Sequence, residues 1–388
     1  EISSASGTVS INGSSKFSGG IISVASGTIA LGGYFTKNGG TLLLEDITLS
    51  LLSDLQWTCN SLLEINQLEL NNLTLTLGNE SSDLQVNNPL ILDQINEKLI
   101  SGAADLELND LLSITNGELS SSGGEIRLNN GLDISGGIVE CLNSSLIIGS
   151  ELGNQVSLIQ SGGSLMADTS SLQLIQKLIL QSIEGFSFQS LDLNSRELSL
   201  ASETSSLSLK EKLIFDLVSE KINTGSADLR LEGGIRMSAG EISSSGGTIA
   251  LSLTSENYFQ NDAVMILENT ALEPVDPDSG SAIMILDGEP NISLNGGTIS
   301  FIDLQRSEGT IGTVSTRDGV SCSESCNGFD ETGSYGLNTH GLYRHVVSSN
   351  WKLSEAEGER KNAQISVKLL SRPLEQVTVY FSSSDVSE

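Results

Sequence analysis

Residues 102–128, GAADLELNDLLSITNGELSSSGGEIRL, decide the fold, because residues 225–251, GSADLRLEGGIRMSAGEISSSGGTIAL, repeat them without a gap. The two copies share the Asp-Leu-x-Leu start, the Gly-Glu-aliphatic turn and the run Ser-Ser-Ser-Gly-Gly. A shorter period lies inside each copy: Leu106 recurs twenty residues later as Ile126. Self-similarity at a fixed period of this length is typical of solenoid proteins.

The twenty-residue period extends beyond the first copy. Leu229 recurs as Ile249, and near the N-terminus Val9 recurs as Ile29. Apolar and polar residues alternate in runs of about four to six, divided by pairs such as Gly-Gly and Asn-Gly, which predicts short strands joined by tight turns. One unit cannot bury its inward aliphatic side chains alone, so units stack. The sequence therefore predicts an all-β fold, a right-handed parallel β-helix (solenoid).

The predicted β-helix covers residues 1–305. At the ~4.8 Å spacing of strands, this length corresponds to ~15 coils and a rod of roughly 70 Å. Two stretches richer in Lys and Glu, 89–100 and 172–222, also fit a helical turn. The Leu-x-Leu pattern that returns after them favours coils with variable loops.

The composition indicates how such coils are filled. Hydrophobic residues make up 38% of the chain and aromatic residues only 4%, so we expect thin core layers of Leu, Ile and Val. Gly131, Gly136 and Gly137 are expected at corners with positive φ, which glycine adopts without steric cost. No segment holds eighteen uninterrupted apolar residues, so no transmembrane helix is expected.

The charge balance narrows the classes of partner. The chain carries 19 Lys and Arg against 49 Asp and Glu, a net charge of -30. This charge repels phosphate backbones and anionic lipid, so neither nucleic acid nor direct membrane insertion is expected. It attracts Ca²⁺ and suits a soluble surface protein.

The C-terminal part departs from the repeat. Residues 306–350 form a segment rich in Gly, Ser and Thr that carries two cysteines, and we interpret it as a cap or junction. Residues 351–388 predict a new β-strand module, because alternating runs at 364–370 and 376–382 flank a Ser-Arg-Pro-Leu turn, as at the start of a β-sandwich. Roughly forty residues cannot bury a sandwich core, so we expect this module to be incomplete.

The coils carry a resemblance to a known class of protein. Residues 128–138, LNNGLDISGGI, and residues 233–242, GGIRMSAGEI, resemble coils of filamentous-haemagglutinin-type and polymorphic-outer-membrane-type β-helix passengers. The resemblance covers about three quarters of the chain and implies a surface adhesin built as a repeat rod. It implies an extracellular or cell-surface location.

The C-terminal module carries a second, shorter resemblance. It resembles the opening of Calx-β-like surface modules in its acidic Glu-x-x-Gly entry, its aliphatic-x-Val-x-Leu strand, its Pro turn and its Val-x-Val strand. These motifs lie at 355–358, 365–369, Pro373 and 377–379. The resemblance implies calcium ligands at Glu355, Glu357 and Asp385.

A second candidate calcium site lies within the β-helix. Asp276, Asp278 and Asp287 belong to the stretch EPVDPDSGSAIMILDGE, whose Asp-Pro-Asp-Ser-Gly resembles the front of a calcium loop. A complete loop needs further oxygen ligands at fixed offsets, including a late Glu, and Pro277 is atypical there. A solvated turn is the alternative and is favoured over calcium.

Four cysteines are too few for a disulfide scaffold. Cys322 and Cys326 are the candidate disulfide, which would close a small loop in an oxidising compartment, and reduced thiols are the alternative. A zinc site that combines them with His340 and His345 is disfavoured, because the spacing does not match zinc motifs. Five Asn-x-Ser/Thr sequons are candidate glycosylation sites in a secreted protein: Asn12, Asn72, Asn79, Asn143 and Asn291.

No residue is assigned a catalytic role. β-Helix enzymes that cleave polysaccharides need acidic and basic residues that converge on one outer face, and no such cluster stands out at coil spacing. Sugar-binding grooves usually stack sugars on aromatic rings, whereas Trp57 and Tyr258 are isolated and favour a packing role. Calcium is the one cofactor with candidate ligands.

The leading hypothesis is a non-enzymatic extracellular rod, structural or adhesive, that projects or assembles at a cell surface. The repeat begins at the first residue, and open solenoid ends favour stacking into a filament. Self-association, other surface proteins and glycans are the expected partners. The alternative is a carbohydrate-binding or polysaccharide-cleaving β-helix protein, which an acidic cluster on one outer face would favour.

Overall fold

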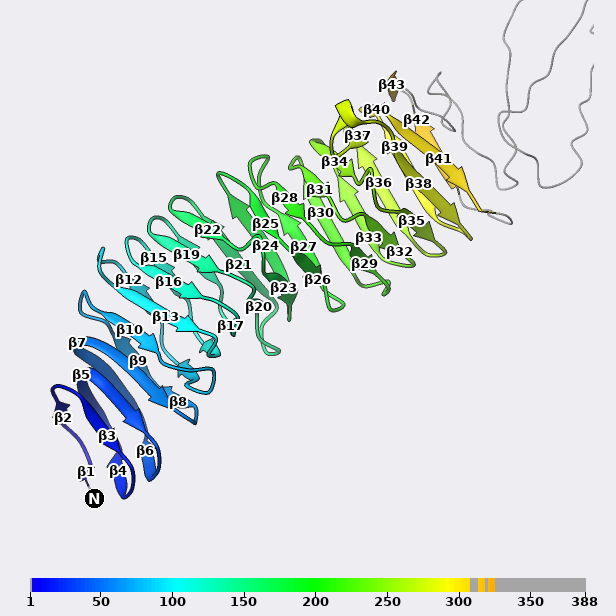
Figure 1. The fold of residues 1–388 in the computed structure, drawn as a ribbon. Helices are drawn as coiled ribbons and strands as arrows, with labels where there is room; N and C mark the ends of the chain where they lie inside the picture. Colours follow the sequence, from blue (N-terminus) through cyan, green and yellow to red (C-terminus); the bar gives the residue numbers. More distant parts are fainter. Residues whose placement is uncertain (1, 308–312, 318–319, 325–388) are drawn as a thin grey trace, which may run out of the picture.

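The computed structural model describes residues 2–307, 313–317 and 320–324. These residues form a parallel β-solenoid of about 14 turns, close to the number of coils predicted from the period. The strands stack along one axis into an elongated body, which Figure 1 shows from its N-terminal end in blue to its C-terminal end in yellow. The 3₁₀ turn Pro277–Ser279 is the one helical element in the described part of the chain.

Each turn contributes short strands to different sheets, so neighbours within a sheet are mostly three strands apart in the chain. Three of the sheets have three, seven and five strands. The strands of the three-stranded sheet are β1 (Ile2–Ser4), β4 (Ile21–Val24) and β6 (Thr41–Leu44). Those of the seven-stranded sheet are β8 (Leu63–Ile65), β11 (Leu84–Val86), β14 (Leu106–Leu108), β17 (Glu125–Leu128), β20 (Ser145–Ile148), β23 (Ser171–Leu174) and β26 (Ser190–Asp192). Those of the five-stranded sheet are β29 (Leu213–Phe215), β32 (Ile235–Met237), β35 (Asn257–Gln260), β38 (Ala282–Asp287) and β41 (Ile302–Arg306).

Two further sheets have ten and seven strands. The ten-stranded sheet contains β2 (Thr8–Ile11), β3 (Ser15–Phe17), β5 (Gly27–Lys37), β7 (Ile47–Cys59), β9 (Gln67–Glu69), β10 (Thr74–Leu77), β13 (Lys98–Gly102), β16 (Glu118–Ser121), β19 (Ile138–Cys141) and β22 (Ser164–Met166). The seven-stranded sheet contains β25 (Phe186–Phe188), β28 (Leu207–Leu209), β31 (Leu229–Leu231), β34 (Thr248–Leu251), β37 (Ala271–Pro274), β40 (Thr298–Ser300) and β43 (Ser321–Glu324).

The longest sheet has eleven strands and runs along most of the body. It contains β12 (Leu90–Leu92), β15 (Leu112–Ile114), β18 (Leu132–Ile134), β21 (Gln155–Gln160), β24 (Lys177–Ser182), β27 (Glu197–Leu200), β30 (Lys221–Gly225), β33 (Glu241–Ser244), β36 (Val264–Glu268), β39 (Asn291–Asn295) and β42 (Thr313–Arg317). The stretches at 89–100 and 172–222 therefore form strands and loops, and the solenoid prediction for them is confirmed.

The register of the strands confirms the period read from the sequence. Leu106 pairs with Ile126 and Leu229 pairs with Ile249. Val9 pairs with Ile29 in the same way. Because each coil repeats the inward positions of the one before it, the aliphatic side chains form one continuous hydrophobic core from Ile22 to Val314.

Two of the three corner glycines have the positive φ that the sequence predicts. Gly131 has a φ of 98° and Gly137 a φ of 65°. The prediction for Gly136 is wrong, because Gly136 is not among the residues with positive φ. Glycine is required there by close approach instead: a Cβ atom on Gly136 would lie 2.0 Å from the carbonyl oxygen of Thr115 in the coil below.

The two long sequence copies do not lie above one another. β14 of the first copy belongs to the sheet that begins at β8, whereas its counterpart β31 belongs to the sheet that begins at β25. The two strands are 17 positions apart in chain order, which is five turns and two further strands. Equivalent residues of the two copies therefore point in different directions around the axis.

The solenoid strands continue past residue 305, where the sequence predicts the β-helix to end. β42 pairs with β39, and β43 pairs with β40. Part of the segment interpreted as a junction therefore adds to the stack. The predicted module at 351–388 lies outside the described residues.

Candidate functional site

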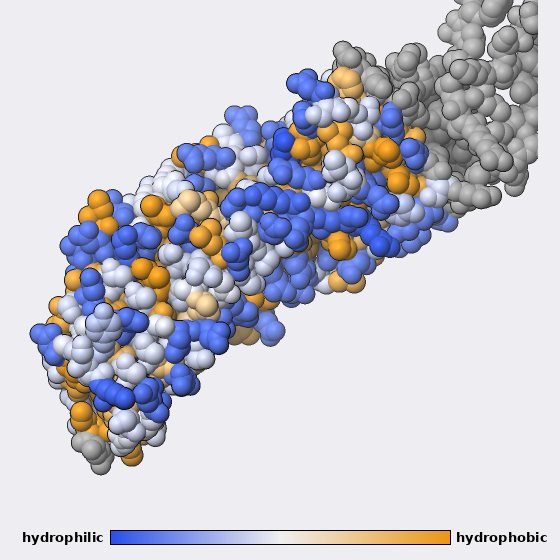
Figure 2. All heavy atoms as spheres, in the orientation of Figure 1, coloured by the Kyte–Doolittle hydropathy of each residue, from blue (hydrophilic) through white to orange (hydrophobic). Residues whose placement is uncertain are grey.

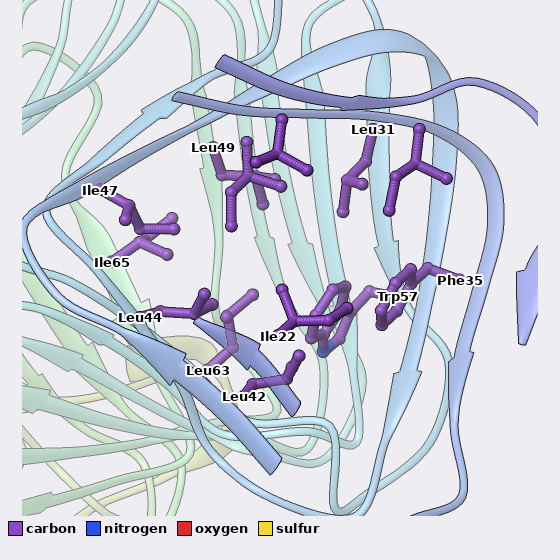
Figure 3. Close-up of a pocket in the computed structure, with 13 residues that line it drawn as sticks. Ile22, Leu31, Phe35, Leu42, Leu44, Ile47, Leu49, Trp57, Leu63 and Ile65 are labelled. Atoms are coloured by element: carbon purple, nitrogen blue, oxygen red, sulfur yellow. The ribbon is translucent and has the colours of Figure 1, made fainter. Parts of the chain in front are cut away.

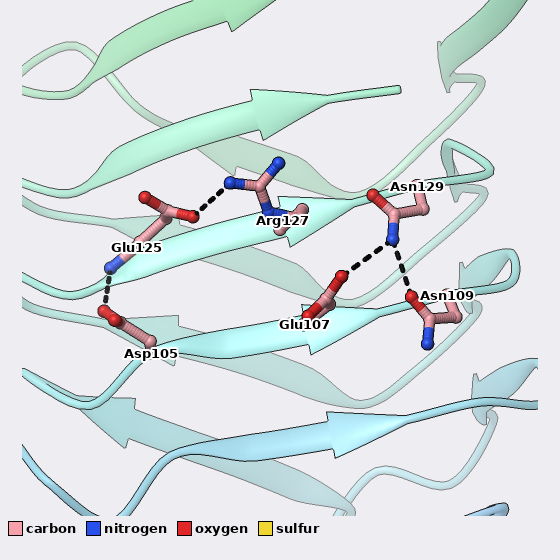
Figure 4. Close-up of polar contacts among 6 residues, drawn as sticks. All are labelled: Asp105, Glu107, Asn109, Glu125, Arg127 and Asn129. Atoms are coloured by element: carbon pink, nitrogen blue, oxygen red, sulfur yellow. Dashed lines mark hydrogen bonds and ion pairs between the residues drawn. The ribbon is translucent and has the colours of Figure 1, made fainter. Parts of the chain in front are cut away.

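Polar side chains on the seven-stranded sheet that begins at β8 are joined in a ladder that climbs from coil to coil. Asn87 Nδ2 donates to Asn66 Oδ1 at 3.3 Å, Asn109 Nδ2 to Asn87 Oδ1 at 2.7 Å, and Asn129 Nδ2 to Asn109 Oδ1 at 2.6 Å. Asn66 in turn donates to Asp46. Figure 4 shows the step between Asn109 and Asn129. Asn66, Asn87 and Asn109 each both accept and donate, and Asn129 donates at the top of the ladder, so these side chains hold neighbouring coils together.

Several carboxylates that the sequence leaves unassigned accept backbone N–H groups one coil away. Asp105 accepts from the Glu125 N–H at 2.8 Å, and Asp228, its counterpart in the second copy, accepts from the Thr248 N–H at 2.7 Å. Figure 4 shows the first of these bonds. This role explains why the repeat keeps an Asp before its Leu-x-Leu strand, because a charged acceptor strengthens the hydrogen bond at a coil corner.

Basic and acidic side chains alternate at the start of four successive strands of the eleven-stranded sheet. Lys177 pairs with Glu197 at 2.7 Å, and Lys221 pairs with Glu241 at 3.2 Å. Glu197 also lies beside Lys221 in the register. In-register parallel stacking places equivalent positions next to one another, so alternation of sign avoids like-charge contacts.

These pairs influence the ionisation of the carboxyl groups. The pKa of Glu197 is lowered, first by the hydrogen bond from Lys177 and further by Ser199. The pKa of Asp168 is also lowered, chiefly by the hydrogen bond from Lys210, whose Nζ lies 2.6 Å from the carboxylate. Both carboxylates are therefore held in their charged form to lower pH than usual.

Buried hydroxyl groups occupy one interior corner of the coils. Ser121 Oγ and Ser144 Oγ are 2.9 Å apart, and the Ser144 N–H donates to Ser170 Oγ at 2.9 Å. Ser170 Oγ donates to the carbonyl of Cys141 at 2.8 Å. The hydroxyls satisfy backbone groups that the corner removes from the strand ladders, as buried polar groups require.

The structure does not gather the candidate calcium ligands of the β-helix into a coordination group. Asp287 accepts hydrogen bonds from Gln260 Nε2 at 2.9 Å and Tyr258 Oη at 3.0 Å, and these bonds lower its pKa. Asp276 accepts from Ser279, and Asp278 lies in the 3₁₀ turn. Within the described ranges, no three His, Cys, Asp or Glu side chains are grouped so as to hold a metal ion.

Several predicted sites fall outside the part of the chain that the structure describes. These residues are Cys326, Glu355, Glu357 and Asp385. Cys322 lies in β43, where its backbone pairs with Ile299. Cys59 and Cys141 are free, buried thiols, and burial together with neighbouring Glu140 raises the pKa of Cys141 to about 12.

The five sequons lie at turns or near the ends of strands. Four of their asparagines are exposed: Asn12, Asn72, Asn143 and Asn291. Asn79 is half-buried, and its side-chain oxygen accepts from Ser82 Oγ at 2.7 Å. The four exposed side chains reach the surface of the folded chain, and glycosylation would require Asn79 to release Ser82 and Asn72 to release the Asn96 N–H, which donates to its Oδ1 at 3.3 Å.

Trp57 has a packing role, as the sequence favours. Its ring is 2% exposed and stacks on Phe35 with ring centroids 4.6 Å apart. Both line a small apolar cavity of about 20 Å³ among the N-terminal coils, and Figure 3 shows the aliphatic side chains that converge on it. The indole Nε1–H is buried without a hydrogen-bond partner among the described residues. A cavity of this size and lining belongs to the core and is no ligand pocket.

Two buried glutamates are structural features that sequence reasoning missed. Glu97 Oε2 accepts from the N–H groups of Asp93 and Gln94, at 2.9 and 3.2 Å. Glu220 Oε2 accepts from those of Asp216 and Leu217, at 2.8 and 3.1 Å. Each carboxylate thereby fixes the loop that precedes it. The signal in the sequence is the dipeptide Glu-Lys, which stands at the same distance before the start of both copies.

The comparisons with known proteins add no family to these observations. No family model matches the chain, and neither a curated protein nor a solved structure matches it. No helix in the described part of the chain has both the length and the apolar character needed to cross a membrane.

Proposed function

We propose that the chain is a non-enzymatic structural and adhesive rod of the extracellular surface, which assembles with copies of itself or with other surface proteins. The observation that carries the proposal is the unbroken hydrophobic core, which runs through successive coils from Ile22 to Val314. A stack of this kind resists bending and holds its surface features at fixed positions along an axis.

The surface chemistry supports the same role. Most hydrogen bonds and ion pairs of the charged and amide side chains join one coil to the next, as in the ladder through Asn109 and the pair Lys177–Glu197. Figure 2 shows hydrophilic residues along the length of one face of the body, with apolar residues scattered between them. The net charge of -30 keeps such a body soluble and discourages non-specific association. These features serve a stalk that displays binding surfaces, and none of them requires a chemical reaction.

Electron microscopy of the natively purified protein tests the proposal directly. We expect straight rods or regular fibres, and surface labelling of intact cells should detect the chain outside the membrane. Fibres would extend the proposal to a filament, whereas isolated rods would support a stalk. Compact particles, or a chain found only inside cells, would overturn it.

A further inference from the structure

The two sequence copies share more than their core. The first copy extends back to residues 90–98, LILDQINEK, and the second to residues 213–221, LIFDLVSEK. Each stretch begins with a strand, continues into a loop and ends with the buried Glu and the Lys of the next strand. We call residues 91–97 the first docking loop and residues 214–220 the second docking loop.

Both docking loops expose the same pair of aliphatic side chains. In the first loop, Ile91 is 59% exposed and Ile95 is 77% exposed. In the second, Ile214 is 54% exposed and Val218 is 69% exposed. A soluble protein gains no stability from exposed aliphatic side chains, so their presence at matched positions needs another reason.

Other outward positions of the copies have diverged, which makes the shared pair informative. Glu107 corresponds to Arg230, and exposed Leu111 corresponds to Gly234. The copies therefore do not keep exposed aliphatic residues in general. Most of the remaining residues that they share are buried, or form turns and the hydrogen bonds between coils, so their retention follows from the fold.

The loops are held rigid in the same way. Glu97 and Glu220 are 5% and 4% exposed, and each accepts hydrogen bonds from two backbone N–H groups of its own loop. The Glu97 N–H also donates to the Gln94 carbonyl at 3.0 Å, and the Glu220 N–H to the Leu217 carbonyl at 3.1 Å. A pre-organised loop loses little conformational entropy when a partner binds.

The two loops lie at opposite strand ends of the eleven-stranded sheet, and their first residues belong to different sheets, Ile91 to β12 of the eleven-stranded sheet and Ile214 to β29 of the five-stranded sheet. The first loop follows β12, a strand of that sheet, and the second precedes β30, another strand of the same sheet. Figure 1 places β12 and β30 in different parts of the stack. They are six steps apart in the sheet order, so at the spacing of parallel strands the loops are separated by roughly 29 Å along the axis.

The small exposed area of the docking loops and the negative charge of the chain decide which kind of partner fits. The exposed aliphatic side chains, two in the first loop and three in the second, where Leu217 is also 45% exposed, cover far less than the ~1,200 Å² of a stable protein interface, so a dimer held by one loop would be weak. A second copy would also bring a net charge of -30 to a chain of the same charge, and each loop carries an acidic residue, Asp93 or Asp216. A cationic partner with apolar side chains satisfies both conditions.

We infer that the two docking loops form a bivalent binding site for an extended, cationic and amphipathic segment of a partner protein, which crosses the eleven-stranded sheet. Each loop supplies a weak apolar contact with an acidic neighbour. Joining the two contacts in one ligand raises the overall affinity well above that of either loop. The inference builds on the proposed structural role by naming a partner chemistry, but rod shape and partner binding are measured separately.

The test uses the full chain and a fluorescent peptide of alternating leucine and lysine, with anisotropy as the readout. The peptide is long enough to span both the axial separation of roughly 29 Å and the width of the eleven-stranded sheet. We expect saturable binding that weakens as salt is added, because charge contributes to it. The variants I91S/I95S and I214S/V218S should each weaken binding by at least about tenfold, and the fourfold variant should abolish it. A peptide too short to reach both loops should bind weakly to the wild type and to both double variants.

The matched control is L152S, because Leu152 is 100% exposed but lies outside the docking loops. This variant should bind the long peptide as the wild type does, and circular dichroism should report the same fold for all variants. Binding that survives in the fourfold variant, or that L152S reduces equally, would overturn the inference. The inference would also be overturned if the wild type bound no peptide but formed dimers that added salt strengthens, and the fourfold variant formed none. The docking loops would then bind a second copy of the chain.

Discussion

At the scale of single residues, the solenoid depends on close approach between coils as much as on side-chain burial. The period predicts which residues point inward, since that depends only on alternation along a strand. It does not reveal why Gly136 is a glycine, because the Thr115 carbonyl that excludes a Cβ belongs to the coil below. The buried Glu97 and Glu220 were missed for a related reason: their partners are backbone groups of a loop whose shape no pattern of apolar residues describes.

The variant G136A tests this account of close approach. A Cβ 2.0 Å from the Thr115 carbonyl oxygen would force the two coils apart, so we expect a loss of about 1–3 kcal/mol in the free energy of unfolding. Urea unfolding monitored by circular dichroism measures it. The control is G19A, because nothing lies within 4 Å of a Cβ at Gly19, and that variant should change stability little. Equal effects of the two substitutions would refute the account.

Cys141 gives a second prediction at this scale. Its pKa is raised to about 12 by burial and by Glu140, so the reactive thiolate is scarce at any pH at which the protein is stable. Iodoacetamide at mildly alkaline pH should leave Cys141 unmodified in the folded protein and alkylate it after unfolding in urea. Peptide mass spectrometry separates Cys141 from the other cysteines. Rapid alkylation in the folded state would show that the coil around it opens readily.

At the scale of strands and sheets, the pattern of the sequence predicts most of what the structure contains. The pairing of Leu106 with Ile126 follows from the period alone, because each coil presents its aliphatic residues at the same place. The rotation of the second copy relative to the first does not follow. It depends on how many strands the intervening coils contain, and coils such as the one between Leu146 and Leu172 are lengthened to 26 residues by a loop.

The alternating ladder on the eleven-stranded sheet predicts a specific dependence on pH. The folded pKa of Glu197 is lowered, so its carboxylate contributes stability above the pKa of the unfolded chain, and this contribution is lost as pH falls through the folded pKa. E197Q should therefore be less stable than the wild type at neutral pH by about 0.5 kcal/mol, a small value because the pair is partly exposed. The difference should vanish in acid.

Chemical denaturation at several pH values measures this difference. E203Q is the control, because Glu203 is an exposed carboxylate on a loop near the same sheet. We expect its stability to follow that of the wild type across the pH range. A difference for E197Q that persists unchanged in acid would show that packing, and not charge, causes the effect.

At the scale of the whole molecule, stability is distributed unevenly along the stack. Central coils bury their inward residues almost completely, as at Leu99 and Leu119, both 0% exposed. In the N-terminal coils, Val9, Ile11 and Leu42 are only partly buried against the core, and the small cavity beside Trp57 lies among them. Solenoid stability is close to a sum of contacts between neighbouring coils, so the N-terminal coils are expected to unfold before the centre.

Trp57 reports on these coils, which makes the expectation measurable. In the variant W351F, Trp57 is the one remaining tryptophan of the chain. Its emission should shift to the red at a lower urea concentration than the loss of far-ultraviolet circular dichroism, which averages over all strands. Such separate transitions signal departure from two-state unfolding.

Filling the cavity should bring the two transitions together. V9I adds one methyl group to the cavity lining and should raise the urea midpoint of the Trp57 transition, whereas V139I, in a tightly packed central coil, should not. Coincident transitions in W351F would mean that the coils unfold as one cooperative unit despite the cavity.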